Sequence, residues 1–342
     1  MLNKLSILEN FDLTDLNTMG VSSKASFFTD AGSVEELKEA IHFAKDKKLE
    51  ILVLGGGSNI LFKNNFKGLV LLNSLGGKKF ISKKDKVEVT VSAGENWHEL
   101  VLFCVKRGLG GIENLSLIPG SVGAAPIQNI GAYGAELQDV FVSLEALIIS
   151  TGEIKTFTKD ECNFGYRDSV FKNELKGQAV ITSVTLALSR NGEPTASYRA
   201  LSELLEKKHI TKPSIKDISD AVIEIRQSKL PDPNEIGNTG SFFKNPVISV
   251  DHFNKLKSKY PEIPSYPVTE RQVKVPAGWL IDKDGWKGKR IGDAGVHEKQ
   301  ALVLVNHGKA TGEEIWNLAS QIRLSIQEKF NILLIPEVNI IG

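Results

Sequence analysis

The fold is decided by the stretch Ile118-Pro-Gly-Ser-Val-Gly-Ala-Ala-Pro126, which is followed closely by Gln128-Asn-Ile-Gly-Ala-Tyr-Gly-Ala135. These residues carry almost no charge and few long side chains, whereas a solvated loop would be more polar. Small residues at this density predict a backbone that is packed against a large, flat partner such as a cofactor. A close-packed crossing of two elements is the alternative, and the residues alone leave it open.

Another glycine-rich segment, Leu54-Gly-Gly-Gly-Ser-Asn59, comes directly after a predicted strand at 51–54. In chain order it is the first glycine-rich segment, and residues 118–135 form the second. Consecutive glycines let backbone N–H groups converge on an anion without obstruction by a Cβ atom. No G-K-[ST] follows, so the segment is not a Walker A loop, and Ile60 stands where the Rossmann fingerprint needs its third glycine. A tight turn or a strand bulge is the alternative. Two such segments in one domain predict a dinucleotide-sized ligand with a diphosphate.

Length and composition bound the class of protein. The chain has 342 residues, 41% hydrophobic and 24% charged, which suits two or three domains with a sizeable core. The net charge of +1 is far from the strong positive charge that is typical of a nucleic-acid-binding protein. Two cysteines, and six histidines without zincin spacing, predict neither a disulfide framework nor a metal site. With no signal-peptide pattern and no apolar run approaching about 18 residues, we expect a cytoplasmic protein without a membrane partner.

Hydrophobic periodicity gives the chain a mixed α+β pattern. Helices are predicted at 34–48, 95–107, 201–208, 214–228 and 311–329. Three of them have capping-box pairs, which are Ser33/Glu36, Ser214/Asp217 and Thr311/Glu314. Strands are predicted at 51–54, 69–72, 87–91, 140–149, 153–157, 180–188 and 332–341. The proline-rich segment 229–234 predicts a domain boundary.

With several further motifs, the two glycine-rich segments resemble those of the UDP-N-acetylenolpyruvoylglucosamine reductase family, also called UDP-N-acetylmuramate dehydrogenases. The further motifs are Tyr166-Arg-Asp-Ser169, Gly240-Ser-Phe-Phe-Lys-Asn-Pro246, Ala277-Gly-Trp-Leu-Ile-Asp282, Gly295-Val-His297 and Pro336-Glu-Val338. They follow one another in the family's order over nearly the whole chain. Each motif alone is weak, but together they are highly specific.

The resemblance implies an α+β fold with a FAD-binding domain of the PCMH or vanillyl-alcohol-oxidase type and a C-terminal α+β substrate-binding domain. We expect the FAD-binding region at 1–230, as two subdomains at about 1–75 and 76–230. The substrate domain is then 231–331, and a C-terminal strand, 332–342, carries Glu337. No histidine or cysteine stands at a covalent-flavin motif, so we expect non-covalent FAD.

The implied reaction is the NADPH-dependent reduction of UDP-N-acetyl-3-O-(1-carboxyvinyl)-glucosamine, the enolpyruvate of UDP-N-acetylglucosamine, to UDP-N-acetylmuramate in peptidoglycan precursor synthesis. Hydride passes from NADPH to FAD, and then from flavin N5 to the methylene carbon of the enol ether. Negative charge spreads onto the carboxylate, so the site needs a cation, a hydrogen-bond donor and a proton source. The resemblance also implies a cytoplasmic monomer that serves cell-wall growth, cell shape and cell division.

The family's three catalytic residues fall on Arg167, Ser241 and Glu337. Arg167 can hold a carboxylate through two hydrogen bonds. Ser241 is the implied proton donor, and Glu337 can stabilise the enolate or orient the serine. A structural surface arginine, a serine in a turn and a glutamate at a strand edge are the alternatives.

The binding residues that the resemblance implies form two groups. The cofactor positions are Gly55, Gly56, Gly57, Ser58, Asn59, Pro119, Gly120, Ser121, Gly123, Ala124, Asn129, Gly131, Ala132, Tyr133 and Gly134. Contacts to the sugar nucleotide are implied at Tyr166, Tyr198, Lys229 and Asn245. The helical insert that begins near Tyr198 indicates the family's subtype with a loop over the diphosphate, and a simple amphipathic helix start is the alternative.

Two features set limits on this interpretation. Many family members read Glu-Pro-Glu-Val-Arg near the C-terminus, whereas this chain has Ile335 and Asn339 in place of the two outer charged residues. Another PCMH-type FAD oxidoreductase, acting on a different alcohol or sugar, is the competing function, but it would lack the motifs at 240–245 and 336–337. A non-catalytic sugar-nucleotide binder should have lost Arg167, Ser241 or Glu337, and all three are present.

Overall fold

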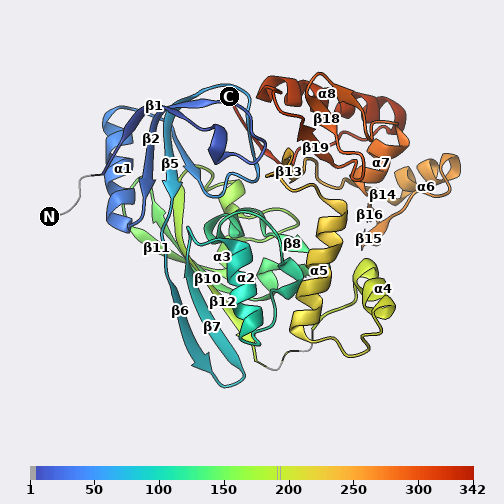
Figure 1. Cartoon of the computed structure of the whole chain (residues 1–342), viewed down its shortest axis with the longest axis horizontal. Helices are drawn as coiled ribbons and strands as arrows, with labels where there is room; N and C mark the ends of the chain where they lie inside the picture. The colour runs from blue at the N-terminus through green and yellow to red at the C-terminus, as the bar shows by residue number, and fades with distance from the viewer. Residues whose placement is uncertain (1–4, 191, 193) are drawn as a thin grey trace. The chain divides into compact units, whose positions relative to one another are not determined.

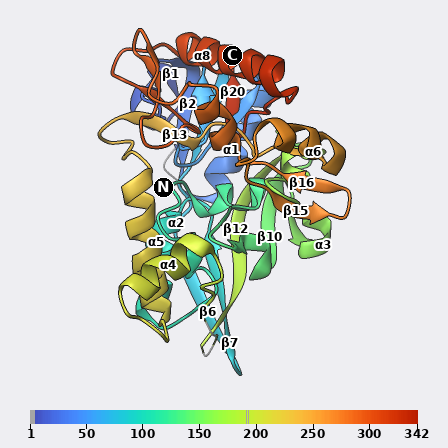
Figure 2. The same ribbon diagram turned by 90° about the vertical axis from the view of Figure 1, so that its right-hand side faces the viewer.

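The computed structural model describes residues 5–190, 192 and 194–342, shown from two sides in Figures 1 and 2. The contacts between residues divide the chain into two compact units. Unit 1 holds the described residues up to Phe11, Ala25–Gly57 and Lys67–Ser228, and unit 2 holds Asp12–Lys24, Ser58–Phe66 and Lys229–Gly342. We predicted an FAD-binding region at 1–230 with subdomains at about 1–75 and 76–230, a substrate domain at 231–331 and a C-terminal strand at 332–342. In the structure, two short N-terminal segments group with the C-terminal part.

Unit 1 begins with a four-stranded sheet in the order β1-β2-β5-β3. Its strands are β1 Leu8–Asp12, β2 Lys24–Ala31, β3 Ile51–Leu54 and β5 Phe66–Asn73. Helix α1 Val34–Asp46 has the predicted capping box of Ser33 and Glu36, and its apolar side packs into the same core as β5. Strands β3 and β5 are parallel. The first glycine-rich segment follows β3 directly, at the carboxyl end of that strand.

A five-stranded antiparallel sheet in the order β11-β10-β12-β7-β6 forms the rest of the unit 1 framework. Its strands are β6 Lys78–Lys83, β7 Lys86–Ser92, β10 Phe141–Ile148, β11 Ile154–Thr158 and β12 Ala179–Ser189. Helix α2 Trp97–Lys106 contributes Trp97, Leu100 and Cys104 to the core that this sheet shares. The short elements α3 Lys159–Cys162, β8 Gly131–Ala132 and β9 Ala135–Glu136 complete this part.

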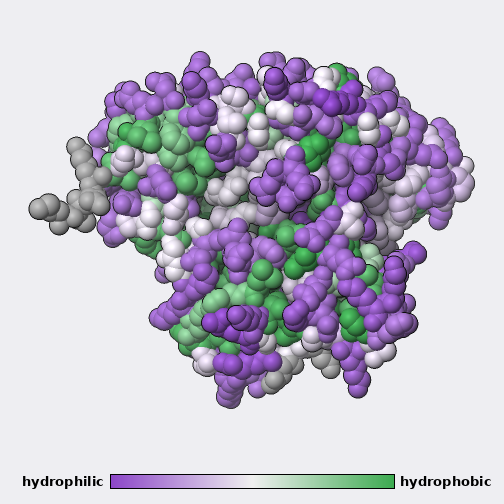
Figure 3. Space-filling view, in the orientation of Figure 1, coloured by the Kyte–Doolittle hydropathy of each residue, from purple (hydrophilic) through white to green (hydrophobic). Residues whose placement is uncertain are grey.

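A few apolar side chains reach the surface around β6, β7 and α2, where the space-filling view is partly green (Figure 3). Phe80, Ile81 and Leu102 are the exposed ones, and the Phe80 ring lies 5.4 Å from that of Phe103. Scattered exposed apolar residues of this kind are normal on a folded protein and do not mark a binding surface.

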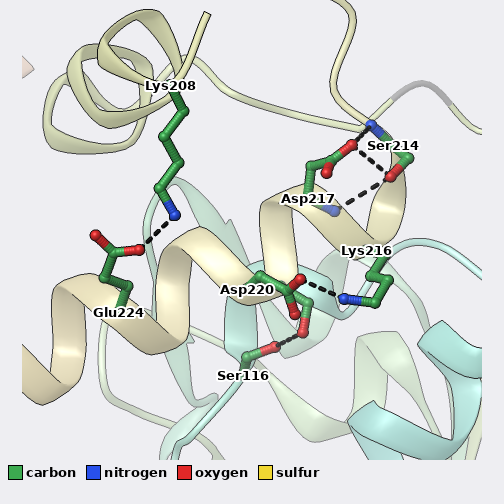
Figure 4. A network of polar contacts seen from close by, with 8 residues as sticks. Ser116, Lys208, Ser214, Lys216, Asp217, Asp220 and Glu224 are labelled. Atoms are coloured by element: carbon green, nitrogen blue, oxygen red, sulfur yellow. Dashed lines mark hydrogen bonds and ion pairs between the residues drawn. The ribbon is translucent and has the colours of Figure 1, made fainter. Parts of the chain in front are cut away.

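Helices α4 Arg199–Lys207 and α5 Ile215–Lys229 form the insert that the sequence predicted. Their apolar sides meet in a small cluster that includes Leu201, Leu205 and Val222. Figure 4 shows the polar contacts of α5, among them the Ser214–Asp217 cap and the ion pairs Lys216–Asp220 and Lys208–Glu224. Exposed pairs like these add little stability. The buried hydrogen bond between the Ser116 and Ser219 hydroxyls, 2.8 Å long, attaches α5 to the rest of unit 1.

Unit 2 is built on a four-stranded sheet in the order β13-β19-β18-β17. The strands are β13 Gly237–Ser241, β17 Arg290–Ile291, β18 Ala294–Val296 and β19 Val303–Asn306. A second sheet contains β14 Val247–Ser249, β15 Tyr266–Thr269 and β16 Gln272–Lys274. The helices are α6 Val250–Lys259, α7 Ala277–Lys283 and α8 Gly312–Phe330, the last with the predicted Thr311/Glu314 capping box.

The two N-terminal segments join unit 2 through specific contacts. Strand β4 Ile60–Phe62 pairs in parallel with β20 Asn339–Ile341. A side chain at Gly312 would collide with the carbonyl of Phe62, so α8 begins directly against β4. The Asn306 amide donates to the carbonyl of Met19 over 3.1 Å. These contacts between residues far apart in sequence group the two segments with the C-terminal part.

The predicted strand at 332–341 is wrong over most of its length, because only Asn339–Ile341 forms a strand. Pro336 instead makes one isolated antiparallel bridge with Phe243. A proline has no N–H to donate, so the ladder cannot run on through this position. Glu337 therefore lies in the extended segment before β20 and not on a strand.

The other predicted elements are confirmed as elements, with ends that differ by a few residues. Cys104 and Cys162 are free, buried thiols, and burial raises the pKa of each to about 12, as expected of core cysteines. No helix among the described residues is long and apolar enough to cross a membrane. The described part of the chain also holds no group of three or more histidine, cysteine, aspartate or glutamate side chains that could bind a metal ion.

Candidate functional site

The two glycine-rich segments lie against each other in unit 1. A Cβ atom added at Gly56 would lie 2.8 Å from the Cα atom of Gly120, and one added at Gly55 would collide with the Ser121 hydroxyl. Real Cβ atoms do not approach a backbone so closely, so only glycine fits at position 56, whereas a side chain at position 55 would require the Ser121 hydroxyl to move. Close packing against the segment 118–135 therefore explains Gly56 directly.

The same contact leaves backbone amides available to a ligand. Gly57 has a φ of +60°, which is the left-handed conformation, and Gly56 is exposed. Among the residues that the structure describes, the N–H groups of residues 55–57 donate to no acceptor of the chain. Successive free amides at the carboxyl end of a parallel strand form an anion-binding concavity. This part of the segment thus fits one phosphate of a dinucleotide diphosphate.

The second segment is held by the connection between β7 and α2. Val122 N donates to the Glu95 carbonyl and Gly123 N to the Ala93 carbonyl, both over 2.8 Å. A Cβ atom at Gly123 would lie 2.5 Å from that of Ala93. Gly123 is therefore required for packing, and its being glycine does not by itself indicate a ligand.

The contact between the segments gives a direct prediction for Gly56→Ala. The Gly56 backbone is not in the left-handed region, so the added methyl tests the available space alone. Gly57 would be a poorer position for this test, because its left-handed φ would strain any other residue. The methyl must push residues 55–57 away from Gly120, and we expect the purified variant to lose most of its bound FAD. The ratio of flavin to protein absorbance measures this.

Gly32→Ala is the matched control for Gly56→Ala. Gly32 also avoids the left-handed region, and an added Cβ would meet only the Glu36 carboxylate, at 3.7 Å. We expect this variant to keep its full flavin content. Full flavin content in Gly56→Ala as well would show that the segments need not stay in contact.

The motif at 165–169 is fastened to the second glycine-rich segment by three hydrogen bonds. The Ser169 hydroxyl donates to the Ile127 carbonyl over 2.7 Å, and the fully buried Asn129 amide donates to the Gly165 carbonyl over 3.2 Å. The Arg167 guanidinium donates to the Gly131 carbonyl over 2.5 Å. Arg167 is therefore placed beside a predicted cofactor residue, and it has a left-handed φ of +55°. This hydrogen bond suits both the predicted catalytic arginine and the alternative, a structural surface arginine.

Tyr133 and Tyr198, predicted for the cofactor and for the sugar nucleotide, are brought together in unit 1. Their rings meet edge to face with 5.3 Å between centroids. The Tyr133 hydroxyl is hydrogen-bonded to Arg226 of α5, a residue that sequence reasoning missed. Burial is the main cause that lowers the pKa of the Arg226 guanidinium, and the positive charge of Arg167 lowers it further. A buried cation beside a second one favours the approach of an anion.

Arg226 also belongs to a chain of contacts that fixes the start of the second glycine-rich segment. Its Nε donates to the Leu117 carbonyl over 3.2 Å, and Leu117 N donates to His98 Nδ1 over 2.9 Å. Leu117 has a left-handed φ of +59°, which is unusual for a branched side chain and needs such support. His98 can accept this hydrogen bond only while Nδ1 carries no proton.

The His98 contact predicts a loss of stability at low pH. Burial is the main cause that lowers the pKa of His98 below the ordinary histidine value, with Arg226 lowering it further and Glu99 opposing. Between the ordinary histidine pKa and the lower pKa of His98 in the folded protein, the unfolded chain binds a proton at this residue and the folded chain does not. The free energy of unfolding therefore falls as the pH drops through this range. We expect the Tm of the wild type to fall between about pH 7.5 and about pH 5.5, and that of His98→Gln to fall less.

Tm measured over this pH range checks the prediction, and His42→Gln serves as its control. His42 is an exposed residue of α1, so its loss should leave the pH dependence as it is in the wild type. Half-buried His297 and exposed His307 also have a lowered pKa, mainly through desolvation, so some pH dependence should survive in His98→Gln. Identical pH profiles for His98→Gln and the wild type would contradict the role assigned to His98.

Ser241 and Glu337 are brought together in unit 2. Ser241 is the last residue of β13 and stands opposite Val303 of β19. Glu337 N donates to the carbonyl of Phe242, the residue after Ser241, over 2.9 Å. The bridge at Pro336 thus places the glutamate next to the serine, although 96 positions separate them in the sequence.

The other predicted residues of unit 2 have clear places. Asn245 accepts a hydrogen bond from Ala277 N at the start of α7, over 2.9 Å. The Asn59 amide donates to the Glu337 carbonyl over 3.4 Å, and Asn339, the residue that replaces the family's usual arginine, donates to the Asn59 carbonyl over 3.0 Å. Ser58, which precedes Asn59, also lies in this unit. Lys229 ends α5 and is exposed.

Comparison with known proteins agrees with these motifs. Residues 232–341 match the model of the UDP-N-acetylenolpyruvoylglucosamine reductase C-terminal domain, and residues 25–158 match an FAD binding domain. The UDP-N-acetylenolpyruvoylglucosamine reductase of Flavobacterium johnsoniae is 51% identical, over 98% of this chain and 100% of the relative. The chain belongs to the UDP-N-acetylenolpyruvoylglucosamine reductase family. The UDP-N-acetylenolpyruvoylglucosamine reductase of Pseudomonas aeruginosa is 44% identical, over 98% of this chain and 99% of the relative.

The fold is that of the reductase family as well. The crystal structure of this reductase, MurB, from Thermus caldophilus aligns with a TM-score of 0.68 at 24% identity, over 99% of both chains. The predicted α+β fold, with an FAD-binding domain and a C-terminal reductase domain, is therefore confirmed. The predicted family and its class of enzyme, an FAD-dependent oxidoreductase of peptidoglycan synthesis, are confirmed too.

Proposed function

We propose that this chain reduces UDP-N-acetyl-3-O-(1-carboxyvinyl)-glucosamine to UDP-N-acetylmuramate, with FAD as the resident cofactor and NADPH as the reductant. The observation that carries the proposal is the match to the reductases over 98% of the chain, with the serine and glutamate motifs side by side in unit 2. Each turnover consumes the enolpyruvyl sugar nucleotide, NADPH and one proton, and it yields the lactyl ether and NADP⁺.

FAD would be held without a covalent bond by the region 1–230. The free amides at 55–57 and the left-handed Gly120 suit its diphosphate, and the remaining predicted positions up to Gly134 would line the rest of the cofactor. When bound, FAD supplies the transfer of hydride from the nicotinamide to the methylene carbon of the enol ether. The chain's own residues then bind, orient and protonate the substrate.

Arg167 would bind the carboxylate of the enolpyruvyl group. Its guanidinium is half-buried, is fixed at the Gly131 carbonyl and lies over the Tyr166 ring, 5.5 Å from the centroid. A cation that is already in place costs no reorganisation when negative charge develops on the enolate. Arg226, with its buried charge, strengthens the positive potential around Tyr133.

Ser241 would donate its hydroxyl proton to the α-carbon of the enolate. The C–H bond forms as the serine O–H bond breaks, and the serine recovers its proton from solvent. Glu337, held beside Phe242 by its own backbone, would orient the serine or stabilise the enolate. A donor fixed at the end of a paired strand transfers its proton along one direction, which sets the configuration of the new centre.

The sugar nucleotide would be bound mainly by the C-terminal domain, 231–331. Asn245 would contact it there, and Lys229, which ends α5 just before this domain, would act as a point charge for a phosphate. Tyr166 and Tyr198 would contact it from unit 1, where both are exposed. Tyr198 at the start of the α4–α5 insert supports the loop-bearing subtype. We further propose that the protein works as a cytoplasmic monomer and supports cell shape and cell division.

Steady-state assays with product analysis test this function. The FAD-loaded protein should oxidise NADPH only when the enolpyruvyl sugar nucleotide is present, and the product should have gained two hydrogens by mass spectrometry. NADH in place of NADPH measures the preference for the nicotinamide. Flavin binding without turnover of this substrate would move the function to another FAD oxidoreductase.

A further inference from the structure

We propose that Asn114 is a positioning residue that joins the backbone of Tyr133 to the segment that carries Tyr198. Its side-chain amide donates two hydrogen bonds, one to the Tyr133 carbonyl and one to the Thr195 carbonyl, each over 3.0 Å. Both N–H bonds of the amide are thereby used. Asn114 is only 3% exposed, so its amide has no bulk water to bond in place of these two carbonyls. This role rests on the proposed function, which assigns Tyr133 to the cofactor and Tyr198 to the substrate.

The turn that carries Asn114 is anchored on several sides. The Ser116 hydroxyl donates to the Glu113 carbonyl over 2.7 Å. It is also hydrogen-bonded to the Ser219 hydroxyl of α5 over 2.8 Å (Figure 4). The Trp97 ring nitrogen of α2 donates to the Leu115 carbonyl over 3.1 Å. Asn114 thus projects from a turn that is tied to two helices of unit 1.

Each of the two carbonyls that Asn114 holds belongs to a segment that needs support. Tyr133 has a left-handed φ of +49°, a conformation that persists only when its surroundings fix it. Thr195 lies three residues before Tyr198 in the irregular stretch that leads into α4. The two tyrosine rings then meet edge to face. One buried amide therefore sets the distance between the segment for the cofactor and the segment for the sugar nucleotide.

Asn114→Asp tests the role with almost no change of shape. The aspartate has no N–H, and its oxygens would face two carbonyl oxygens that repel it. We expect KM for the sugar nucleotide to rise by about tenfold or more, because the Tyr198 segment is released from its place. The rate of FAD reduction by NADPH should stay within about twofold, because the other bonds of the second glycine-rich segment remain. These are the hydrogen bonds that the Ala93 and Glu95 carbonyls accept from it and the one that the Asn129 amide donates.

Limited trypsin digestion gives a readout that does not depend on activity. Arg199 is exposed at the first turn of α4, next to Tyr198. Release of the segment should make cleavage after Arg199 faster in Asn114→Asp than in the wild type. Failure of the proposed function would show as an inactive wild type, whereas the digestion would still report on Asn114.

Asn17→Asp is the matched control. Asn17 is 5% exposed, and its amide donates to the Leu13 and Val21 carbonyls of unit 2 over 2.9 and 3.0 Å. Its loss should lower Tm as Asn114→Asp does, yet leave KM and cleavage after Arg199 unchanged. Equal effects of both variants on KM, or unchanged cleavage in Asn114→Asp, would overturn the proposal. If Asn114→Asp does not fold, Asn114→Ser, which loses both bonds without adding a charge, takes the same measurements.

Discussion

Replacing Ser241 with alanine should slow the reaction with the sugar nucleotide by about 10²- to 10⁴-fold, the range that a placed proton donor supplies. Reduction of FAD by NADPH should stay near the wild-type rate, because that step needs no proton from this residue. Ser241 is held by backbone pairing with Val303, so loss of its hydroxyl leaves the strand in place. Anaerobic stopped-flow measurement of each half-reaction separates the two rates.

Ser249→Ala is the control for this experiment. The Ser249 hydroxyl caps α6 by accepting a hydrogen bond from His252 N over 3.2 Å, so its loss should cost about 1 kcal/mol of stability. Both half-reactions should keep their rates in this variant. An equal fall of both half-reactions in Ser241→Ala would contradict its role as proton donor.

Replacing Arg167 with alanine should have the second large effect. The enolate would lose the cation at its carboxylate, and we expect the half-reaction with the sugar nucleotide to slow by about 10²- to 10³-fold. Arg167→Lys keeps the charge but cannot form two parallel hydrogen bonds, so its rate should lie between those of the alanine variant and the wild type. The same stopped-flow experiment measures all three proteins.

The hydrogen bond from Arg167 to the Gly131 carbonyl makes flavin content an essential second readout. If Arg167 acts on the substrate, the alanine variant should be purified with as much FAD as the wild type. Arg290→Ala removes another arginine that donates to a backbone carbonyl, that of Gly292 at 2.7 Å, and should change neither rate nor flavin content. Loss of flavin in Arg167→Ala alone would mean that the residue supports the fold of the glycine-rich segment.

Local signals in the sequence predicted the elements of this fold well. The capping boxes at Ser33/Glu36 and Thr311/Glu314 set the starts of α1 and α8, because each box involves residues only three positions apart. A local pattern also explains why the segment 332–338 was wrongly predicted as part of a strand. Ile332 and Leu334 are buried while Leu333 and Ile335 are exposed, which is the alternation of a strand without a partner strand.

Parts of the candidate site depend on contacts that no local pattern contains. The glycines at 55, 56 and 123 were predicted to surround a cofactor, but their immediate cause is the approach of chain segments far apart in sequence. Asn114 and Arg226 were missed because their partners lie 19 or more positions away and follow no periodic pattern. The position of Arg226 one turn before Lys229 on α5 was the one available signal.

An anaerobic absorbance spectrum, followed through two additions, tests the central claim most directly. The purified protein should show a flavin band that NADPH bleaches and the enolpyruvyl sugar nucleotide then restores. That result would establish the cofactor, the reductant and the substrate in one experiment. A band that NADPH bleaches but this substrate does not restore would contradict the proposed reaction, and a protein that binds no FAD would contradict the interpretation of both glycine-rich segments.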